Sequence, residues 1–305
     1  MTAPANPTTA VDTHPDRRRG TLAGASAVLM WSTLATLTAL SGHVPPFQLL
    51  AMSFALAFVV GLALWQWEDR RAAVPTPFLQ RFRLPLRIWA LGLFGLFGYH
   101  FAYFTAMRLA PPVEVGLLNY LWPLLIVLFT AFLPGERLRP LQIVGALMGF
   151  AGAALIVTRG QGIYVDPRYI TGYLFGLAAG VIWAVYSILS RRAGGVPTSS
   201  VGAFCAGTAA LAVVCHLLFE TTVWPTGWQW AAVAGLGLGP VGLAFYTWDY
   251  GVKRGNIQAL GALAYTASLL STLLLIALGL AEATWVIAVA LVLIVGGAVL
   301  GSTSR

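Results

Sequence analysis

The ten residues from Glu114 to Pro123, Glu-Val-Gly-Leu-Leu-Asn-Tyr-Leu-Trp-Pro, lie inside an apolar run that ends near Phe132. They place a carboxylate, an amide, a phenol and an indole at the depth of a membrane. Pro123 has no backbone N–H, and in a helix that group would have bonded the carbonyl of Asn119. Such a helix is typical of a wall facing a wet cavity, because lipid cannot satisfy a freed carbonyl. We expect the rest of the chain to form the scaffold around this cavity.

The composition of the chain sets its class. Hydrophobic residues make up 58% of the 305 positions and charged residues 9%, against roughly 45–50% and ~25% in soluble domains. Apolar runs of about 20 residues recur along the chain, and each can cross ~30 Å of hydrocarbon as a helix. The composition therefore predicts an all-α membrane protein. Ten transmembrane helices are expected, near residues 20–41, 46–67, 87–109, 112–132, 139–157, 170–190, 197–219, 227–251, 256–279 and 283–303.

The charged residues predict an orientation. The first apolar run, residues 21–41, is longer than the core of about 7–15 residues in a signal peptide, so residues 1–19 are expected to be a cytoplasmic tail. With this tail inside, 15 of the 18 lysines and arginines fall on the inner side, and only Arg108, Arg159 and Arg168 fall outside. This positive-inside bias predicts that both termini are cytoplasmic. It also accounts for the net charge of +8 without a nucleic-acid partner.

The two halves of the chain share one plan. Phe104-Thr105 recurs as Tyr246-Thr247 and Tyr120 as Tyr265. Five further positions recur 152 residues later, where Gly20, Leu22, Gly24, Ala27 and Trp31 match Gly172, Leu174, Gly176, Ala179 and Trp183. Each half would hold five helices, an odd number, so the second half enters the membrane from the opposite side. Such an inverted repeat, with units expected at 20–158 and 170–303, places a substrate site near the midplane between the halves.

The repeat also makes predictions about single helices. Gly98 matches Pro240, so both halves are expected to have a weak point midway along the same helix. Pro123 is matched by Ser268, so the helix at 256–279 is expected to lack the kink that Pro123 introduces. Three glycines at spacing four are expected to pack against a neighbouring helix, namely Gly172, Gly176 and Gly180.

Ionisable groups within the apolar helices are rare, and each is a candidate functional residue. His100 is expected either as a neutral histidine satisfied by a hydrogen bond or as part of a cavity wall. Tyr99 and Tyr103, four residues apart, would share a face of the same helix. Glu114 lies in the first turn of its helix, where it either complements the helix dipole or binds a substrate amine.

Three ionisable groups nearer the helix ends are expected to be structural. Asp249 precedes Lys253 by four residues, which predicts a local ion pair. His216 and Glu220 lie close to the predicted outer surface, where we expect them to be solvated.

Polar and aromatic side chains inside helices complete the candidate site. They are Trp31 and Ser32 in the first helix, Trp183, Tyr186 and Ser187 on one face of the sixth, and Trp248 in the eighth. With Asn119 and Tyr120, they would form a pocket with rings, hydroxyls and an amide but little charge. Such a pocket suits an amphipathic small molecule that is neutral or zwitterionic.

Motifs for catalysis and nucleotide binding are missing from the sequence. It contains no Gly-x-x-x-x-Gly-Lys-Ser/Thr loop, no His-Glu-x-x-His and no Gly-x-Ser-x-Gly. We therefore expect no catalytic residue, no metal site and no cofactor, and we do not expect an enzyme. Cys205 and Cys215 lie in one apolar run and cannot form a helix-internal disulfide, so no redox role is expected.

These features resemble a known family. Ten helices in two inverted repeats, with Gly135-Glu136 after the fourth helix, resemble the EamA-type branch of the drug/metabolite transporter superfamily. Within that branch, four segments look like those of bacterial aromatic amino-acid exporters: Trp31-Ser32-Thr33, Glu114 to Pro123, Ile182-Trp183-Ala184 and Gly255-Asn256. The resemblance implies a secondary transporter of the bacterial inner membrane that exports aromatic and other neutral amino acids. It also implies a central cavity lined by Trp31, Tyr99, Asn119, Tyr120, Trp183 and Trp248.

The sequence is also compatible with other functions. A second hypothesis keeps the fold and changes the cargo to other small metabolites or drugs. Small multidrug exporters carry a glutamate in their first helix, whereas residues 20–41 contain no acidic residue, which disfavours cationic drugs. A passive pore would need a continuous polar stripe, and the polar positions here are isolated. Proton exchange through His100 or Glu114 and facilitated export are both compatible with the sequence, and a monomer in the lipid bilayer is expected.

Overall fold

A computed structural model describes residues 14–162, 165–279 and 282–302. Over these ranges every regular element is a helix, as the composition predicted. The first half contains α1 (His14–Trp31), α2 (Leu34–Leu40), α3 (Pro46–Asp69), α4 (Leu86–Leu93), α5 (Tyr99–Leu109), α6 (Pro112–Asn119), α7 (Leu121–Phe129) and α8 (Pro140–Thr158). The second half contains α9 (Ile170–Arg192), α10 (Val201–Phe219), α11 (Gln229–Leu238), α12 (Ala244–Arg254), α13 (Ile257–Ala264), α14 (Thr266–Ala277) and α15 (Trp285–Ser302).

Several of these helices are pieces of one membrane span. Within the described ranges, nine stretches have the length and apolar composition needed to cross a membrane, and Trp285–Gly301 is a further, shorter apolar helix. The pairs α1–α2, α4–α5, α6–α7, α11–α12 and α13–α14 each form one span with a break in the middle. This arrangement agrees closely with the ten predicted helices.

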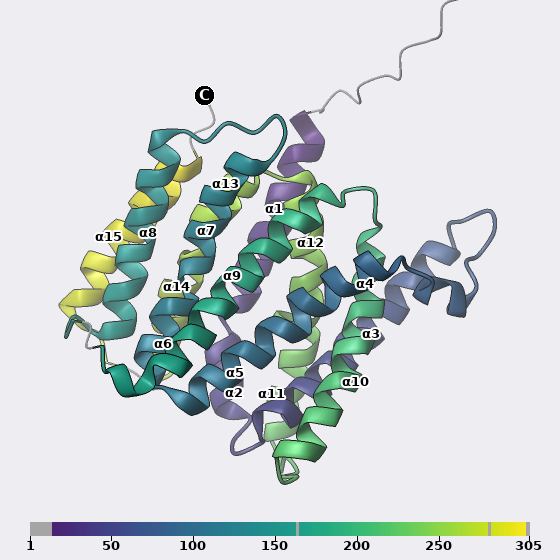
Figure 1. The fold of residues 1–305 in the computed structure, drawn as a ribbon, viewed down its shortest axis with the longest axis horizontal. Coiled ribbons are helices and arrows are strands. Elements are labelled where there is room, and N and C mark those ends of the chain that lie inside the picture. The colour runs from purple at the N-terminus through teal and green to yellow at the C-terminus, as the bar shows by residue number, and fades with distance from the viewer. Residues whose placement is uncertain (1–13, 163–164, 280–281, 303–305) are drawn as a thin grey trace, which may run out of the picture.

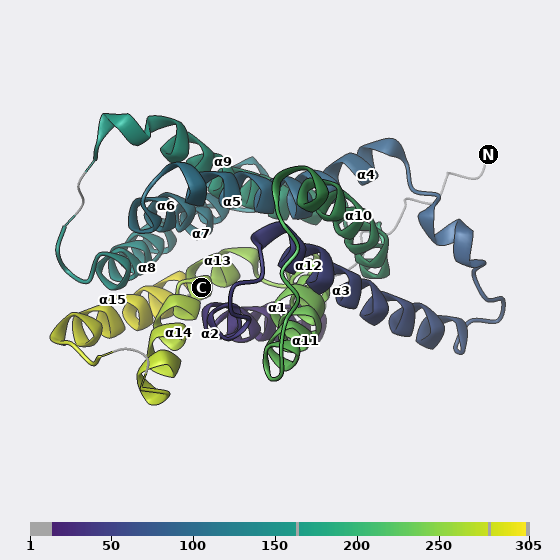
Figure 2. The same cartoon turned by 90° about the horizontal axis from the view of Figure 1, so that it is seen from below.

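The spans form two layers that each mix helices of both halves (Figure 2). In one layer α9 packs against α5, α6 and α7, and in the other α1 packs against α12, α13 and α14. In the repeat α1 corresponds to α9, α12 to α5, and α13–α14 to α6–α7, so equivalent helices make equivalent contacts in the two layers. The layers are joined at their edges where α3 packs on α10 and α8 packs on α15. The fold is thus the predicted all-α inverted repeat.

The two ends of the bundle differ in charge. The first and last described residues lie at the same end (Figure 1). We call this the basic end, because it carries Arg17 to Arg19 of α1, Arg191 and Arg192 of α9, and Lys253 and Arg254 of α12. The other end, here the far end, carries the connections from α2 to α3, α5 to α6, α8 to α9 and α10 to α11 (Figure 1).

The predicted weak points at Gly98 and Pro240 are confirmed. A π-helical turn over Phe94–Gly98 separates α4 from α5, and another over Gly239–Leu243 separates α11 from α12. Pro240 has no N–H to give to the helix ladder, and a π turn accommodates the missing bond. Each turn releases a carbonyl near the middle of the bundle, where side chains of the candidate site can bond to it.

The span that contains Pro123 is also broken as predicted. α6 ends at Asn119 and α7 begins at Leu121. The carbonyl oxygens of Leu118 and Asn119 face Gly180 of α9, 3.1 and 3.0 Å from where a Cβ would stand. The N–H of Leu124 donates to the phenol oxygen of Tyr265 over 3.0 Å. The break is therefore stabilised by the other half of the chain.

The prediction that residues 256–279 lack a kink is wrong. This span breaks at Tyr265, between α13 and α14. Hydroxyl groups take the part that proline has in the first half: Thr266 Oγ1 donates to the carbonyl of Leu263 over 2.7 Å, and Ser268 Oγ donates to that of Tyr265 over 2.8 Å. Such bonds compete with the helix ladder and bend it. Both halves therefore carry the same break for different chemical reasons.

The predicted glycine row packs as expected. A Cβ on Gly172 would lie 2.5 Å from Cβ of Ala110, and Gly180 lies against the carbonyls of α6 described above. In the other half, a Cβ on Gly20 would lie 2.5 Å from the backbone nitrogen of Gly255. The equivalent glycines thus let α9 approach the α5–α6 connection and α1 approach the α12–α13 connection.

Candidate substrate site

Aromatic side chains from five helices meet in the middle of the bundle. We define the ring cluster as Trp31 of α1, Tyr99 of α5, Trp122 of α7, Trp183 and Tyr186 of α9, and Phe245 and Trp248 of α12. The ring centroid of Trp31 lies 5.7 Å from that of Trp183 and 5.0 Å from that of Trp248. Because Trp31 and Trp183 are equivalent in the repeat, matching side chains of the two halves touch at the centre. An inverted repeat places its site at such a point.

The two π turns present carbonyl groups to the residues of the site. Nδ1 of His100 lies 2.6 Å from the carbonyl oxygen of Leu96, so the imidazole N–H donates there. Nε1 of Trp31 donates to the carbonyl oxygen of Pro240 over 3.0 Å. His100 also packs against the rings of Tyr99 and Phe245. His100 is therefore the hydrogen-bonded histidine of the first prediction, and it adjoins the ring cluster.

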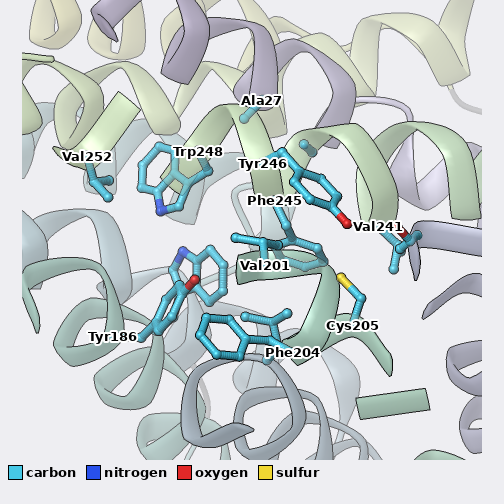
Figure 3. Close-up of a cluster of buried hydrophobic side chains, with 14 of the residues drawn as sticks. Ala27, Tyr186, Val201, Phe204, Cys205, Val241, Phe245, Tyr246, Trp248 and Val252 are labelled. Carbon is cyan, nitrogen blue, oxygen red and sulfur yellow. Dashed lines mark hydrogen bonds between the residues drawn. The ribbon is translucent and has the colours of Figure 1, made fainter. Parts of the chain in front are cut away.

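A short hydrogen-bond chain holds the buried side of the cluster together. Nε1 of Trp248 donates to Oγ of Ser187 over 3.1 Å, and this hydroxyl donates to the carbonyl of Trp183 over 2.9 Å. Figure 3 shows Trp248 and Tyr186 together with Phe245, against Val201 and Phe204 of α10. The sequence predicted that Trp183, Tyr186 and Ser187 share a face, and all three are buried on the same side of α9.

Asn119 supplies the amide of the site. Its Nδ2 donates to the phenol oxygen of Tyr99 over 3.3 Å. Its Oδ1 is buried and has no hydrogen-bond partner among the described residues. An unsatisfied buried amide oxygen costs free energy, so Asn119 Oδ1 has the capacity to accept a hydrogen bond from a further donor.

The exposure of the site residues changes along the bundle. Trp183, Tyr186 and Trp248 are buried, whereas Trp31 and Tyr99 are half-buried. Tyr103, one turn nearer the far end than Tyr99, is also half-buried and stacks on Tyr99 at 6.1 Å between ring centroids. Coverage of the site is therefore denser toward the basic end.

Three predicted site residues lie outside these contacts. Ser32 Oγ donates to the carbonyl of Leu29 over 2.6 Å, within its own helix. Tyr120 packs against a separate apolar cluster that contains Tyr265. Glu114 lies in the first turn of α6 as predicted, but the structure records no bond or ring contact from it to the described residues of the ring cluster. Its Oε2 is buried and has no hydrogen-bond partner in the described part of the chain.

Phe245 and Trp122 also belong to the ring cluster, although neither was among the predicted site residues. The ring of Phe245 lies 5.6 Å from that of Trp183, and the ring of Trp122 lies 5.9 Å from that of Trp31. Spacing could have found Phe245, since it precedes Trp248 by three residues and so shares its helix face. Trp122 follows the helix break, and the direction of its side chain depends on that break.

Buried polar groups fasten the basic end. The predicted ion pair is present, with Nζ of Lys253 2.7 Å from Oδ2 of Asp249. Asp249 also accepts hydrogen bonds from Ser190 at 2.6 Å and Thr198 at 2.7 Å. Nearby, Arg191 forms an ion pair with Glu136 of the first half. These contacts tie the end of α9 to α12 and to the connection before α8.

The prediction that His216 and Glu220 are solvated is wrong. The side chain of Glu220 is 2% exposed and accepts hydrogen bonds from the backbone N–H groups of Phe47 and Gln48, both at 3.0 Å. Nδ1 of His216 lies 3.1 Å from Glu220, and Arg108 donates to the same carboxylate over 3.0 Å. The start of α3 has free N–H groups that attract a carboxylate, which is why Glu220 is drawn inward.

Comparison with known proteins agrees with this architecture. The EamA-like transporter family model matches twice, at residues 18–158 and 170–303. The aromatic amino acid exporter YddG of Ancylobacter novellus is 52% identical over 283 residues, which are 92% of this chain and 96% of that protein. The YddG exporter of Escherichia coli K12 is 25% identical over 276 residues, which are 85% of this chain and 88% of that protein.

Two further comparisons extend this set. The threonine/homoserine exporter RhtA of Escherichia coli K12 is 25% identical over 199 residues, which are 64% of this chain and 57% of that protein. A solved crystal structure with 52% sequence identity superimposes with a TM-score of 0.88 and covers 94% of this chain and 97% of its own. This chain is therefore a multi-pass membrane transporter that belongs to the EamA-like transporter family.

Proposed function

We propose that this protein exports aromatic and other neutral amino acids across the bacterial inner membrane. The proposal rests on one observation above all: Asn119 Oδ1, a buried amide oxygen with no hydrogen-bond partner among the described residues, adjoins a cluster of aromatic rings. The names of the relatives support the same cargo, since they include exporters of aromatic amino acids and of threonine and homoserine. Helices of both repeats, 20–158 and 170–303, would line the site.

The rings are suited to the side chain of the cargo. Trp31, Trp122 and Trp183 meet edge to face, with centroid distances of 5.7 to 6.4 Å. An aromatic amino acid that enters between them exchanges these contacts for equivalent ones with its own ring. A smaller neutral side chain fits the same apolar surface but gains less from it.

Polar groups at the edge of the cluster are suited to the head group. Oδ1 of Asn119 would accept a hydrogen bond from the ammonium, together with the phenol oxygen of Tyr99. The indole N–H groups of Trp122 and Trp183 donate to no described residue in this structure and are available to a carboxylate. These acceptors and donors carry no net charge. They therefore suit a zwitterion, whose positive and negative charges cancel. No carboxylate belongs to the cluster, which disfavours cationic drugs as the cargo.

The unequal ends of the bundle support alternating access. In the described conformation Asp249 and Arg191 tie the end of α9 to its neighbours at the basic end, whereas the half-buried site residues lie toward the far end. The positive-inside rule makes the basic end cytoplasmic, with both termini there. Export would require the contacts of Asp249 and Arg191 to separate so that the site opens to the cytoplasm. The two layers would then rock about the ring cluster.

Transport by purified protein in proteoliposomes tests the proposal. We would measure movement of labelled phenylalanine, labelled threonine and a cationic dye, with and without a pH gradient. We expect both amino acids to be transported and the dye to be excluded. Dependence on the gradient would indicate proton exchange, and independence would indicate facilitated export. Transport of the dye in preference to both amino acids would overturn the proposed cargo.

Three variants test the roles of the site residues. Trp183→Ala should reduce transport of phenylalanine more than that of threonine, and Trp183→Phe should restore part of it. Asn119→Leu, which keeps the size of the side chain, should reduce both. Trp228→Ala, at a position that is 90% exposed, is the matched control. Unchanged phenylalanine transport by correctly folded Trp183→Ala would show that the rings do not bind the cargo.

A further inference from the structure

A groove lies at the basic end, on the rim of the bundle and away from the ring cluster. It has a volume of about 580 Å³ and is formed by the start of α4, the end of α9 and the connection that follows α9. Arg87 of α4 and Arg192 of α9 both line it. Between them the surface is apolar, formed mainly by Ile88, Leu91 and Leu189. The groove therefore combines two guanidinium groups with an apolar surface.

Neither arginine has a carboxylate partner among the described residues. Arg87 is exposed, and none of the described hydrogen bonds or ion pairs involves its side chain. Arg192 makes one described side-chain bond, from Nη2 to the carbonyl oxygen of Phe132 over 2.5 Å. The adjacent Arg191, in contrast, pairs with Glu136 and donates to two carbonyl oxygens. The charge of Arg191 is balanced within the protein, and the charges of the groove are not.

The position of the groove identifies the type of molecule that would balance these charges. α4 begins and α9 ends at the level where a membrane changes from hydrocarbon to head groups, since both are membrane spans. Leu189 on the wall of the groove is 38% exposed, so the apolar surface of the groove is open to its surroundings. A soluble anion would use the arginines and leave this apolar surface bare. A phospholipid would use both.

We propose that this groove binds an anionic phospholipid, with its phosphodiester between Arg87 and Arg192 and an acyl chain along Ile88, Leu91 and Leu189. Guanidinium groups form paired hydrogen bonds to phosphate oxygens. Basic pockets between helices at the cytoplasmic side are suited to such head groups. The lipid would bridge α4 of the first half and α9 of the second, which pack against each other. This inference does not depend on the identity of the cargo.

Native mass spectrometry of the full-length protein, released from detergent, tests the proposal. The probes are phosphatidylglycerol and phosphatidylcholine of equal chain length, titrated separately. Phosphatidylglycerol should bind more tightly, and Arg87→Gln/Arg192→Gln should weaken its binding roughly tenfold or more. Arg70→Gln/Arg83→Gln is the matched control, because it removes the same charge from two exposed arginines at the same end of the bundle. The control should bind phosphatidylglycerol as the unaltered protein does.

Three outcomes would overturn the proposal. Equal loss of phosphatidylglycerol binding in the two double variants would assign the affinity to general surface charge. Equal affinity for the two lipids would remove the role of the arginines. Displacement of phosphatidylglycerol by millimolar inorganic phosphate would indicate a site for a soluble anion. Thermal unfolding of each variant without lipid separates a loss of binding from a loss of fold.

Discussion

The first span and α9 hold equivalent places in the two repeats, yet the first span is broken and α9 is continuous. α1 ends at Trp31 and α2 begins at Leu34, whereas α9 runs from Ile170 to Arg192 through the equivalent Trp183. The residues that follow the two tryptophans explain the difference. Ser32 and Thr33 donate through their hydroxyls to the carbonyls of Leu29 at 2.6 Å and Met30 at 2.7 Å, and the matching residues of α9 are alanine and valine. Hydroxyls of this kind compete with the helix ladder, and methyl groups cannot.

The two spans also differ in how firmly they are held. Of the seven residues of α2, only Thr36 is buried, whereas α9 buries residues along its whole length and is fastened at its basic end. A segment with few buried contacts opens at low free energy. We therefore expect α9 to stay in place during transport and α2 to move about the break after Trp31. Exchange between open and closed states would then be unequal in the two halves.

The largest effect is expected where α9 is fastened to α12. Lys253→Met leaves the buried carboxylate of Asp249 without its cation, and breaking a buried pair in this way costs about 3–5 kcal/mol. Thermal unfolding of the detergent-purified protein would measure the loss. Arg254→Gln, at the exposed neighbouring position, should change stability by less than about 0.5 kcal/mol. A loss in Lys253→Met no greater than that of Arg254→Gln would show that the ion pair does not hold α9.

A somewhat smaller effect is expected at the other end of α9. In Gly172→Ala the new Cβ would lie 2.5 Å from that of Ala110 and 2.8 Å from the backbone of Leu109, so α9 must shift. Overpacking of this kind costs about 1–3 kcal/mol. Gly176→Ala is the matched control on the same face, because its Cβ would have no neighbour closer than 3.5 Å. Gly20→Ala should behave like Gly172→Ala, since its Cβ would lie 2.5 Å from Gly255; equal melting temperatures for the two α9 variants would contradict the close approach.

Most of the fold could be predicted from the sequence, because membrane spans and repeats leave strong local signals. The lengths of the apolar runs predicted the membrane spans. The distribution of arginine and lysine predicted which helix ends lie on the same side of the bundle. The recurrence of Trp31 as Trp183 predicted that the two halves are repeats. Helix breaks were predicted where proline marks them, at Pro123 and Pro240. Breaks made by serine and threonine were missed, since these residues are common in unbroken helices and only their side-chain direction distinguishes the two cases.

The candidate site could be predicted in part. Residues at helical spacing, such as Trp183, Tyr186 and Ser187, came together as expected. Residues whose direction depends on a break or on a distant partner did not follow from spacing. Glu220 shows this well: its attraction to the start of α3 depends on a contact between residues more than 170 positions apart, and no local pattern reports such a contact.

The break in the first span can be removed by copying α9. Ser32→Ala/Thr33→Val deletes two side-chain hydrogen bonds to the backbone, each of which contributes about 0.5–1.5 kcal/mol. The ladder should then continue from α1 into α2, and transport should slow by roughly fivefold, as a change of about 1 kcal/mol implies. Distances from a spin label on α2 to one on α9 would measure the motion directly. Thr38→Val is the control, since its hydroxyl lies away from the break, and slowing in this control equal to that of the double variant would exclude the break as the hinge.

The smallest effect is expected for the pH dependence of stability, through Asp166 at the start of α9. The side chain of Asp166 accepts hydrogen bonds from the guanidinium of Arg168 and, with a smaller effect, from its backbone N–H, and these bonds hold the pKa of this carboxyl below its usual value. A carboxyl whose pKa is lower in the folded state stabilises the fold above the unfolded value of about 3.9, and this contribution is lost as the pH falls through the folded value. Asp166→Asn should therefore unfold at a lower temperature than the unaltered protein at pH 6, and the difference should shrink at pH 3. Because Arg168 is mostly exposed, solvent screens the ion pair. The effect of Asp166→Asn should therefore be smaller than those of the three other changes predicted above. If the difference in unfolding temperature instead grew as the pH fell, the ionised carboxylate of Asp166 would not stabilise the start of α9.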